Sequence, residues 1–393
     1  MAGLYIHIPY CKSKCIYCDF YSTPQVETME QYVHLLLCEA RLRKNEISLS
    51  SPSKIEGDRG SMMDTRKIPF TTLYLGGGTP SVIPIHLMTQ LIKGLNDIFE
   101  LNQVEEFTIE VNPDDVTTEY IASLREMGVN RVSMGVQSFN DNELQSINRR
   151  HTAQQAIKAV DAIKEGGINN VSIDLIYGLP GQSLESWQRN IQQAVDLDVQ
   201  HISAYCLSYE KGTRLWVMRE TGKVQESSDE LCVDMHHALA SMLKKAGFEH
   251  YEISNFARPG FRSRHNSSYW NFTPYLGLGA AAHSYDGTTR RYNPASIKEY
   301  IDKISSGNTA FDEEHLEWWE RHDEEVMLRL RTSDGLDLNL FKEHYGDKVL
   351  NTLLSKAQPF IEQGLLTLTG TTLTFTRNGV MLSDNIIRSL MWE

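Results

Sequence analysis

The chain has 393 residues, which is long enough for two or three domains. Hydrophobic residues make up 41% and charged residues 23%, an ordinary globular balance. The net charge of −13 argues against non-specific nucleic-acid binding, because that binding relies on basic patches against phosphate. There is no apolar run of about 18 residues and no secretory signal, so we expect no transmembrane segment and a cytoplasmic protein.

The first two hundred residues alternate short β-like runs with amphipathic helical runs. This alternation favours βαβ units around a parallel sheet, with helices outside. Six repeats favour an α/β fold of the incomplete (β/α)6 barrel type, and a flat doubly wound sheet is the alternative. The expected strands are Leu4–Ile8, Thr72–Leu75, Phe107–Val111, Arg131–Gly135, Val171–Ile176 and His201–Leu207. The expected helices are Met29–Arg43, His86–Phe99, Glu119–Met127, Asn142–Asn148, Ala153–Glu165 and Leu184–Leu197.

We predict three parts: a barrel over 1–212, a barrel extension over 213–311, and a smaller, mainly helical, winged-helix-like part over 312–393. Residues 45–67 are polar and longer than an ordinary connection, which predicts a solvated surface insertion, with a functional lid as the alternative. The helices expected in the later parts are Ser228–Ala246, Glu314–Arg331, Leu338–Tyr345, Val349–Gln363 and Gly379–Leu390, and the expected hairpin strands are Leu365–Leu368 and Thr372–Phe375.

Three cysteines, Cys11, Cys15 and Cys18, lie within eight residues directly after the first expected strand. Soft thiolates suit iron–sulfur centres, and three of them can hold three irons of a 4Fe-4S cluster, leaving one iron open to a small molecule. Zinc is one alternative, but structural zinc usually takes two separated pairs of Cys or His ligands, and the other cysteines here are isolated. Disulfides are disfavoured in a chain without a secretory signal.

Other distinctive residues fall at the carboxyl ends of the expected strands, the edge where parallel α/β proteins bind ligands. Gly76–Gly78 would let the backbone approach a ligand and offer N–H groups, with a plain tight turn as the alternative. Glu110 could accept hydrogen bonds from a ribose hydroxyl or an amino group, with a cap of the next turn as the alternative. The remaining residues at this edge are Asn112, Gln137, Ser138, Asp174, Tyr177, Gly178, Tyr205 and Cys206.

The Cys-x3-Cys-x2-Cys spacing resembles the radical S-adenosylmethionine (SAM) superfamily, and longer runs resemble the oxygen-independent coproporphyrinogen III oxidase group. Those runs are Tyr5-Ile-His-Ile-Pro-Tyr-Cys11, Gly76-Gly-Gly-Thr-Pro-Ser81, Ile109-Glu-Val-Asn-Pro113, Arg131-Val-Ser-Met-Gly-Val-Gln137 and Ile173-Asp-Leu-Ile-Tyr-Gly-Leu-Pro180. The resemblance implies that SAM chelates the open iron and contacts Tyr5, Gly77 and Glu110. The positions that match a second SAM site of the oxidase are Tyr17, Gly78, Thr79, Gln137, Arg149, Asp174 and Cys206.

Two features depart from the oxidase pattern. The oxidase has a further cysteine two residues after the third cluster ligand, where this chain has Phe20. The oxidase also has an extra N-terminal segment, whereas this chain begins three residues before its first expected strand. Both departures favour the sister group HemW, whose members look like the oxidase but are understood as heme chaperones.

The run His265-Asn-Ser-Ser-Tyr-Trp270 resembles the HNxxYW motif of that sister group. A neutral imidazole is a good axial ligand for heme iron, and the rings of Tyr269 and Trp270 could lie against a porphyrin face. A structural histidine beside core aromatics is the alternative for His265. Weaker candidates for contact with heme propionates or iron are Arg258, Arg262, Arg264 and His283.

The sequence therefore predicts a heme chaperone with a 4Fe-4S cluster and S-adenosylmethionine that passes heme to an acceptor protein, membrane-bound acceptors included. The alternative is an oxygen-independent coproporphyrinogen III oxidase, in which a radical derived from SAM abstracts hydrogen from propionate side chains. A third reading is a radical SAM enzyme acting on another tetrapyrrole. If the chain forms an oligomer, we expect a homodimer.

Overall fold

The computed structural model describes residues 1–47 and 68–392, so most of the predicted insertion 45–67 lies outside the described residues. The chain divides into two compact units. The first unit contains Met1–Asp174, Leu207–Gln225 and Thr273–His315, and the second contains Leu175–Cys206, Glu226–Phe272 and Leu316–Glu393. The three-part division expected from the sequence stays a prediction.

The first unit is built on a mixed sheet. Its strands are β1 (Ala2–Ile8), β2 (Phe70–Gly77), β3 (Glu106–Val111), β4 (Arg131–Gln137), β9 (Tyr275–Leu278), β10 (His283–Tyr285), β11 (Thr289–Tyr292) and β12 (Asp312–His315), together with most of β5 (Asn170–Tyr177). Strands β9, β1, β2, β3 and β4 are neighbours in that order and run parallel. Strands β10, β11 and β12 extend the sheet beyond β9 in antiparallel pairs.

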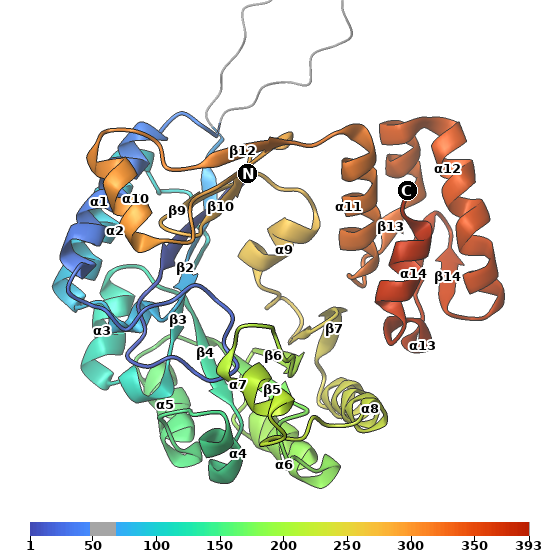
Figure 1. Cartoon of the computed structure of the whole chain (residues 1–393), viewed down its shortest axis with the longest axis horizontal. Coiled ribbons are helices and arrows are strands. Elements are labelled where there is room, and N and C mark those ends of the chain that lie inside the picture. Colours follow the sequence, from blue (N-terminus) through green and yellow to red (C-terminus); the bar gives the residue numbers. More distant parts are fainter. Residues whose placement is uncertain (48–67, 393) are drawn as a thin grey trace, which may run out of the picture. The chain divides into compact units, whose positions relative to one another are not determined.

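Helices follow these strands in the predicted order and cover the sheet from outside (Figure 1). They are α1 (Met29–Leu42), α2 (Ile85–Phe99), α3 (Thr118–Glu126), α4 (Asp141–Ser146), α5 (Ala153–Glu165), α7 (Arg214–Glu220) and α10 (Ile297–Ser305), with short 3₁₀ turns at Pro80–Val82 and Pro113–Asp115. Thr152 starts α5 with a capping box, in which its side chain accepts from the Gln155 N–H and the Gln155 side chain accepts from the Thr152 N–H.

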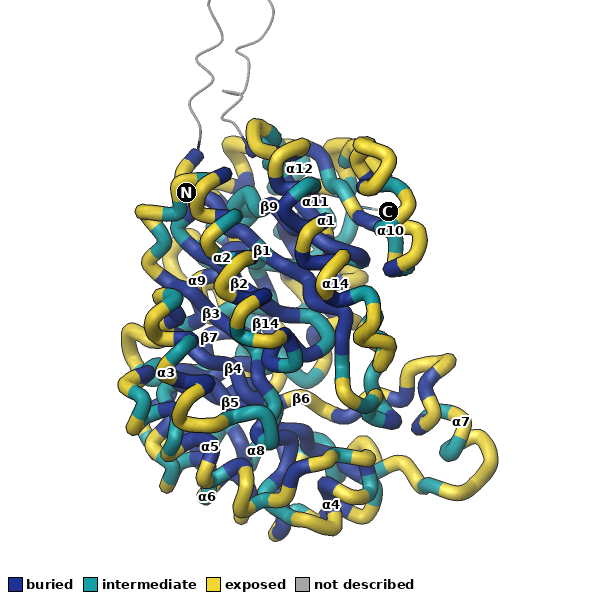
Figure 2. Tube along the Cα trace, turned by 90° about the vertical axis from the view of Figure 1, so that its left-hand side faces the viewer, coloured by how far each residue is buried: buried dark blue, intermediate teal, exposed yellow. Residues whose placement is uncertain are grey.

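The parallel strands consist mainly of apolar residues because they are buried in the sheet. Every residue of β4 except Gly135 is buried, and the strands are the dark core of Figure 2 while exposed residues gather on the helices. The predicted strands and helices of this region are confirmed within one or two residues at most ends. Two placements differ: Gly76 and Gly77 belong to β2 itself, and Asp174 lies inside β5 instead of at its end.

The second unit holds the remaining elements: α6 (Leu184–Asp196), β6 (His201–Cys206), α8 (Asp229–Lys245), β7 (Glu249–Glu252), β8 (Asn255–Ala257), α9 (Arg264–Trp270), α11 (Trp318–Leu330), β13 (Leu336–Asp337), α12 (Leu338–Glu362), β14 (Leu366–Thr369), β15 (Thr372–Phe375), α13 (Arg377–Val380) and α14 (Ser383–Leu390). Strand β8 pairs antiparallel with β6 and β7, and β15 lies between β13 and β14 in a separate antiparallel sheet.

The helical C-terminal part has its own apolar core around Leu336, Phe341 and Leu353. The predicted pair of helices is confirmed as one long element, α12, that breaks at Gly346, whose φ of 81° is left-handed. The predicted hairpin is also confirmed. The prediction that a helix begins at Glu314 is wrong, because residues 312–315 pair with β11 and the helix starts only at Trp318. Within 1–47 and 68–392, we find no helix of the length and apolarity needed to cross a bilayer.

A buried carboxylate in α1 joins distant parts of the first unit. Glu39 Oε1 accepts from Arg43 Nη1 at 2.9 Å and Asn293 Nδ2 at 2.8 Å. Its Oε2 accepts from the Gly279 N–H at 2.8 Å and the Tyr300 hydroxyl at 2.7 Å. Four donors compensate the burial of the charge, so α1, the β9–β10 connection and α10 depend on one side chain.

We expect Glu39→Ala to lower the free energy of unfolding by about 3 kcal/mol or more. The substitution removes one of the two carboxylates that pair with the buried Arg43, and it takes an acceptor from Asn293, the Gly279 N–H and Tyr300. Urea unfolding would measure the loss. Glu30→Ala, an exposed change in the first turn of the same helix, is the matched control and should cost only a few tenths of a kcal/mol. Equal effects of the two substitutions would contradict this account.

Candidate functional site

The cysteine loop lies directly after β1. The N–H of Cys11 donates to the carbonyl of Thr23 at 3.0 Å, and the N–H of Cys18 donates to the carbonyl of Cys15 at 3.2 Å. Burial raises the pKa of the Cys11 and Cys18 thiols, and Cys15 raises both further by its charge. The three sulfurs therefore lie close enough to act on one another.

A chain of hydrogen bonds connects two of these cysteines through three other residues. The Cys11 sulfur is 3.2 Å from the Thr79 hydroxyl, which accepts from Asn112 Nδ2 at 3.2 Å. The Asn112 side-chain oxygen accepts from Arg149 Nη2 at 2.8 Å, and Arg149 Nη1 donates to the Cys15 sulfur at 3.4 Å. The two sulfurs are thus held by residues that follow β2, β3 and α4.

Arg149 is the centre of this arrangement. Its guanidinium also donates to the Gly135 carbonyl, and its charge acts on the neighbouring Tyr17. Gln137 ends β4 in the left-handed region, with φ of 67°, which a residue other than glycine adopts rarely. A β-carbon at Gly135 would lie 2.8 Å from Gln137 Nε2 and 3.2 Å from Arg149 Nη2, so Gly135 leaves room for both side chains.

The glycine run at the end of β2 packs closely against the protein. Gly77 has φ of 108°, and a β-carbon there would lie 2.6 Å from the His7 ring. A β-carbon at Gly78 would lie 2.9 Å from the carbonyl oxygen of Ile8. The N–H of Gly77 donates to Glu110 Oε2 at 3.1 Å, and that of Gly78 donates to Ile8 at 2.8 Å. Both N–H groups, which the sequence suggested for a ligand, are used within the protein.

Glu110 is partly accessible but largely desolvated. The Tyr74 hydroxyl donates to its Oε1 at 2.8 Å. Burial raises the pKa of Glu110 to about 7, the Tyr74 hydrogen bond opposes this, and the charge of nearby Asp174 adds to it. Glu110 and Asp174 therefore form a pair of carboxyl groups at one edge of the sheet, with the buried Arg131 as the nearby cation.

Tyr5 and His7 line the same region from β1. The Nε2 atom of His7 is 3.3 Å from the Tyr21 carbonyl oxygen. A carbonyl can only accept a hydrogen bond, so Nε2 carries the proton of the neutral ring. The other nitrogen, Nδ1, accepts from the Tyr5 hydroxyl at 3.0 Å. Burial lowers the pKa of His7 to about 4, so its ring is neutral at neutral pH. The exposed His283 acts on His7 by its charge.

The structure thus gathers the predicted residues of the first unit into two adjoining groups. Around the cysteines lie Tyr17, Thr79, Gln137 and Arg149, and around the end of β2 lie Tyr5, Gly77, Gly78, Glu110 and Asp174. The sequence placed Asn112 at the ligand-binding edge without a specific contact, and it assigned no role to the Arg131 side chain. The Ile-Glu-Val-Asn-Pro run was a signal for Asn112, and a charged residue opening an apolar strand was a signal for Arg131.

This donor set fits an iron–sulfur cluster. Three soft sulfur ligands stand on one loop, and Arg149 and Thr79 direct polar hydrogens at two of them, as donors to cluster sulfurs do. Among the described residues, no three Cys, His, Asp or Glu side chains converge on a position for a single metal ion. A cubane spaces its thiolates more widely than one ion does, so the site suits a cluster better than zinc.

Cys206 lies in the second unit, at the end of β6. Its side chain is within hydrogen-bonding reach of Cys232 on α8 and of Tyr177. Burial raises the pKa of the Cys206 thiol to about 12, and Cys232 adds to the rise. Its predicted contact with SAM stays a prediction.

The HNxxYW run forms the short helix α9, capped by Ser263. His265 is fully buried, and its Nε2 is 2.9 Å from the Tyr269 hydroxyl, one helical turn away. Tyr269 and Trp270 are partly exposed. Arg258 donates to the Ala246 carbonyl, and Arg262 pairs with Glu249 at 3.3 Å and Asp334 at 3.0 Å, so both arginines have protein partners. Heme ligation through Nε2 of His265 would require that atom to leave the Tyr269 contact.

The raised pKa of Glu110 makes stability depend on pH. The folded protein keeps this proton up to about pH 7, while the unfolded chain loses it near pH 4.5, so stability falls as the pH rises between these values. We expect wild-type protein to lose roughly 2 kcal/mol from this residue over that range, and Glu110→Gln to lack this loss. Urea unfolding at several pH values would measure it, with the exposed Glu105→Gln as control. An unchanged slope in Glu110→Gln would contradict the assignment.

Comparison with known proteins identifies the family of the chain. The radical SAM superfamily matches residues 5–194, and the HemN C-terminal domain matches residues 316–382. The chain is 32% identical to the heme chaperone HemW of Bacillus subtilis, covering 100% of both chains. It is 31% identical to the heme chaperone HemW of Lactococcus lactis, over 99% of this chain and 97% of that protein.

The solved structure of coproporphyrinogen III oxidase (HemN) from Escherichia coli, a radical SAM enzyme, superimposes with a TM-score of 0.82 at 24% identity, covering 100% of this chain and 90% of that one. This likeness confirms the predicted radical SAM α/β fold with a smaller helical C-terminal part. The full-length identity with the curated relatives separates the chain from the oxidase that shares its fold. The chain belongs to the HemW family of the radical SAM superfamily.

Proposed function

We propose that this protein is a heme chaperone: it binds heme and transfers it to an acceptor protein, and it carries a 4Fe-4S cluster and SAM. The observation that carries the proposal is the identity of 32% to a heme chaperone over the full length of both chains. The residue after the cysteine loop supports it, since Phe20 is 71% exposed where the oxidase pattern has a further cysteine. No observation favours the oxidase alternative.

Cys11, Cys15 and Cys18 are the proposed cluster ligands. Arg149 and Thr79 orient two of the sulfurs before any cluster binds, and the charge of Arg149 favours thiolate at Cys11. When bound, the cluster supplies electron transfer to SAM on its open iron. The loop provides three sulfur ligands for four irons, so one iron has no protein ligand and is open to SAM.

The carboxyl pair at the end of β2 is the proposed contact for the amino or ribose groups of SAM. Glu110 lies next to Asp174 and its carboxyl is desolvated, so a cationic amino group would stabilise its ionised form. Gly77 holds the Glu110 carboxylate in place through its N–H. The ring of Tyr5 lies beside that of Tyr74, with their centroids 6.1 Å apart, and Tyr74 in turn contacts Glu110.

The helix α9 is the proposed heme contact. Tyr269 and Trp270 offer partly exposed aromatic surface. The Nε2 atom of His265 is occupied by its hydrogen bond with the Tyr269 hydroxyl. Breaking one neutral hydrogen bond costs about 1 kcal/mol, which a bond between iron and imidazole can exceed. His265 would therefore become a ligand only when heme displaces the Tyr269 contact.

For the cluster, we expect Cys15→Ser to lose bound iron and acid-labile sulfide after anaerobic reconstitution, because a hydroxyl is a poor ligand for iron–sulfur centres. Cys38→Ser is the matched control, since Cys38 lies on α1 beside His34 and should leave the iron content unchanged. A four-iron cluster retained in Cys15→Ser would contradict the ligand assignment.

For heme, we expect His265→Gln to lower heme affinity by about tenfold or more, because the amide can keep the Tyr269 contact but cannot ligate iron as imidazole does. Tyr269→Phe should leave affinity equal or raise it, since it releases the imidazole. Absorption titration with hemin would measure both, with exposed His86→Ala as control. Unchanged affinity in His265→Gln would place the ligand elsewhere, with His283 the next candidate.

The same preparations separate the chaperone from the oxidase. Anaerobic incubation with SAM, a reductant and coproporphyrinogen III should give no protoporphyrinogen while the cluster stays intact. Formation of the decarboxylated product would overturn the chaperone proposal in favour of the oxidase.

A further inference from the structure

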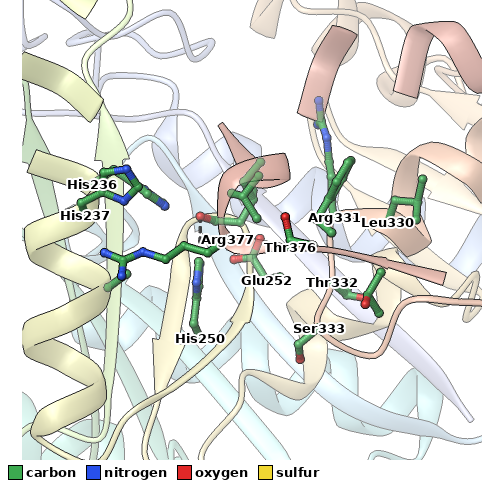
Figure 3. Close-up of a pocket in the computed structure, with 15 residues that line it drawn as sticks. His236, His237, His250, Glu252, Leu330, Arg331, Thr332, Ser333, Thr376 and Arg377 are labelled. Carbon is green, nitrogen blue, oxygen red and sulfur yellow. Dashed lines mark hydrogen bonds between the residues drawn. The ribbon is translucent and has the colours of Figure 1, made fainter. Parts of the chain in front are cut away.

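The second unit contains a cavity of about 270 Å³ outside the residues discussed above. Helix α8, strand β7, the segment after α11 and the start of α13 form its walls. Figure 3 shows its polar lining, which consists of His236, His237, His250, Glu252, Arg331 and Arg377.

Backbone hydrogen bonds hold the walls together. The N–H of Ile253 donates to the Arg331 carbonyl at 3.1 Å, and the N–H of Ser333 donates to the Tyr251 carbonyl at 2.9 Å. His250 and Glu252 of β7 both line the cavity, although the pairing of β7 with β8 is irregular between them. His250 is fixed further by stacking on Phe256, with ring centroids 4.2 Å apart. These contacts fix the residues that line the cavity within the second unit.

One end of the cavity gathers three imidazole rings and a guanidinium group. The ring of His236 lies 6.3 Å from that of His237 and 5.9 Å from that of His250. Arg377 extends towards these rings (Figure 3). Burial lowers the pKa of His236 to about 4, and His250, His237 and Arg377 each lower it further by their charge. The ring of His236 is therefore neutral at neutral pH and offers an N–H donor, while Arg377 supplies positive charge for an anion.

Two polar atoms in the lining lack a partner. His237 Nδ1 and Arg331 Nε are buried without a hydrogen bond among the described residues. The one acidic residue in the lining, Glu252, already contacts Asn255 and the N–H of Ser254. Burial also raises the pKa of Glu252 to about 7, so it contributes less than a full negative charge at neutral pH. Arg331 Nε is an unpaired donor, and His237 Nδ1 is one in the tautomer that protonates it. Together with the guanidinium of Arg377, these atoms favour a ligand that carries negative charge.

We propose that this cavity binds the carboxylate or phosphate group of a small anionic metabolite, held by Arg377 and the three histidines. The guanidinium fork matches the oxygen geometry of either group. The imidazoles do not form a metal site, since no three such ligands converge among the described residues. The volume lies below the ~300–1,000 Å³ of pockets for drug-sized ligands, so the site takes a small molecule and not a porphyrin.

Isothermal titration of the full-length protein with inorganic phosphate and, separately, with glutarate tests the proposal. We expect saturable binding of at least one of them; phosphate alone would identify a phosphate ligand and glutarate alone a carboxylate ligand. Arg377→Gln should weaken this binding about tenfold, and Arg377→Lys should weaken it less, because it keeps the charge but loses the fork. Arg377 is an exposed residue, so neither change should unfold the protein.

Arg388→Gln is the matched control, because Arg388 is an exposed arginine of α14 outside the cavity and its loss changes the net charge equally. His237→Phe should also weaken binding, since it removes a buried donor and keeps a ring of similar shape. The proposal is overturned if neither probe binds saturably, or if Arg388→Gln weakens binding as much as Arg377→Gln. Heme binding and cluster content stay separate readouts, because none of these residues belongs to the heme or cluster contacts proposed above.

Discussion

The cysteine site depends on the hydrogen bonds that the guanidinium of Arg149 donates. It donates to the Cys15 sulfur, the Asn112 side chain and the Gly135 carbonyl, and so ties the loop after β1 to the ends of β3 and β4. A loop of three cysteines has no regular structure to order it, and burying several thiols next to one another is unfavourable when they ionise. A buried cation with five N–H donors in a fixed plane addresses both problems at once.

Close backbone approach is the second constraint on the same site. Gly77 and Gly78 let the end of β2 lie against His7 and Ile8, and this contact brings the Gly77 N–H to the Glu110 carboxylate. In the same unit, Glu39 holds α1 against the β9–β10 connection through four donors. Buried charges thus order both the cysteine loop and the neighbouring part of the sheet.

Histidines in the second unit show two states that a buried imidazole can take. His265 is paired with Tyr269 and is closed to a ligand until that contact breaks. His236, His237 and His250 instead line a cavity together with Arg377, where we propose that an anion binds. In the first arrangement a protein hydroxyl satisfies the imidazole, and in the second a buried imidazole nitrogen has no hydrogen-bond partner among the described residues.

The sequence by itself determined the order of strands and helices, the three cysteines and the family, because hydrophobic periodicity and short motifs are local properties of the chain. Tertiary structure alone decided how the motifs meet: that Asn112 connects Thr79 to Arg149, that Glu39 reaches Asn293 and Tyr300, and that His265 is buried. It also assembled the cavity from His236, His250 and Arg377, which are separated by many residues and carry no motif. Burial and long-range pairing depend on which surfaces come together, and no local pattern in the chain records that.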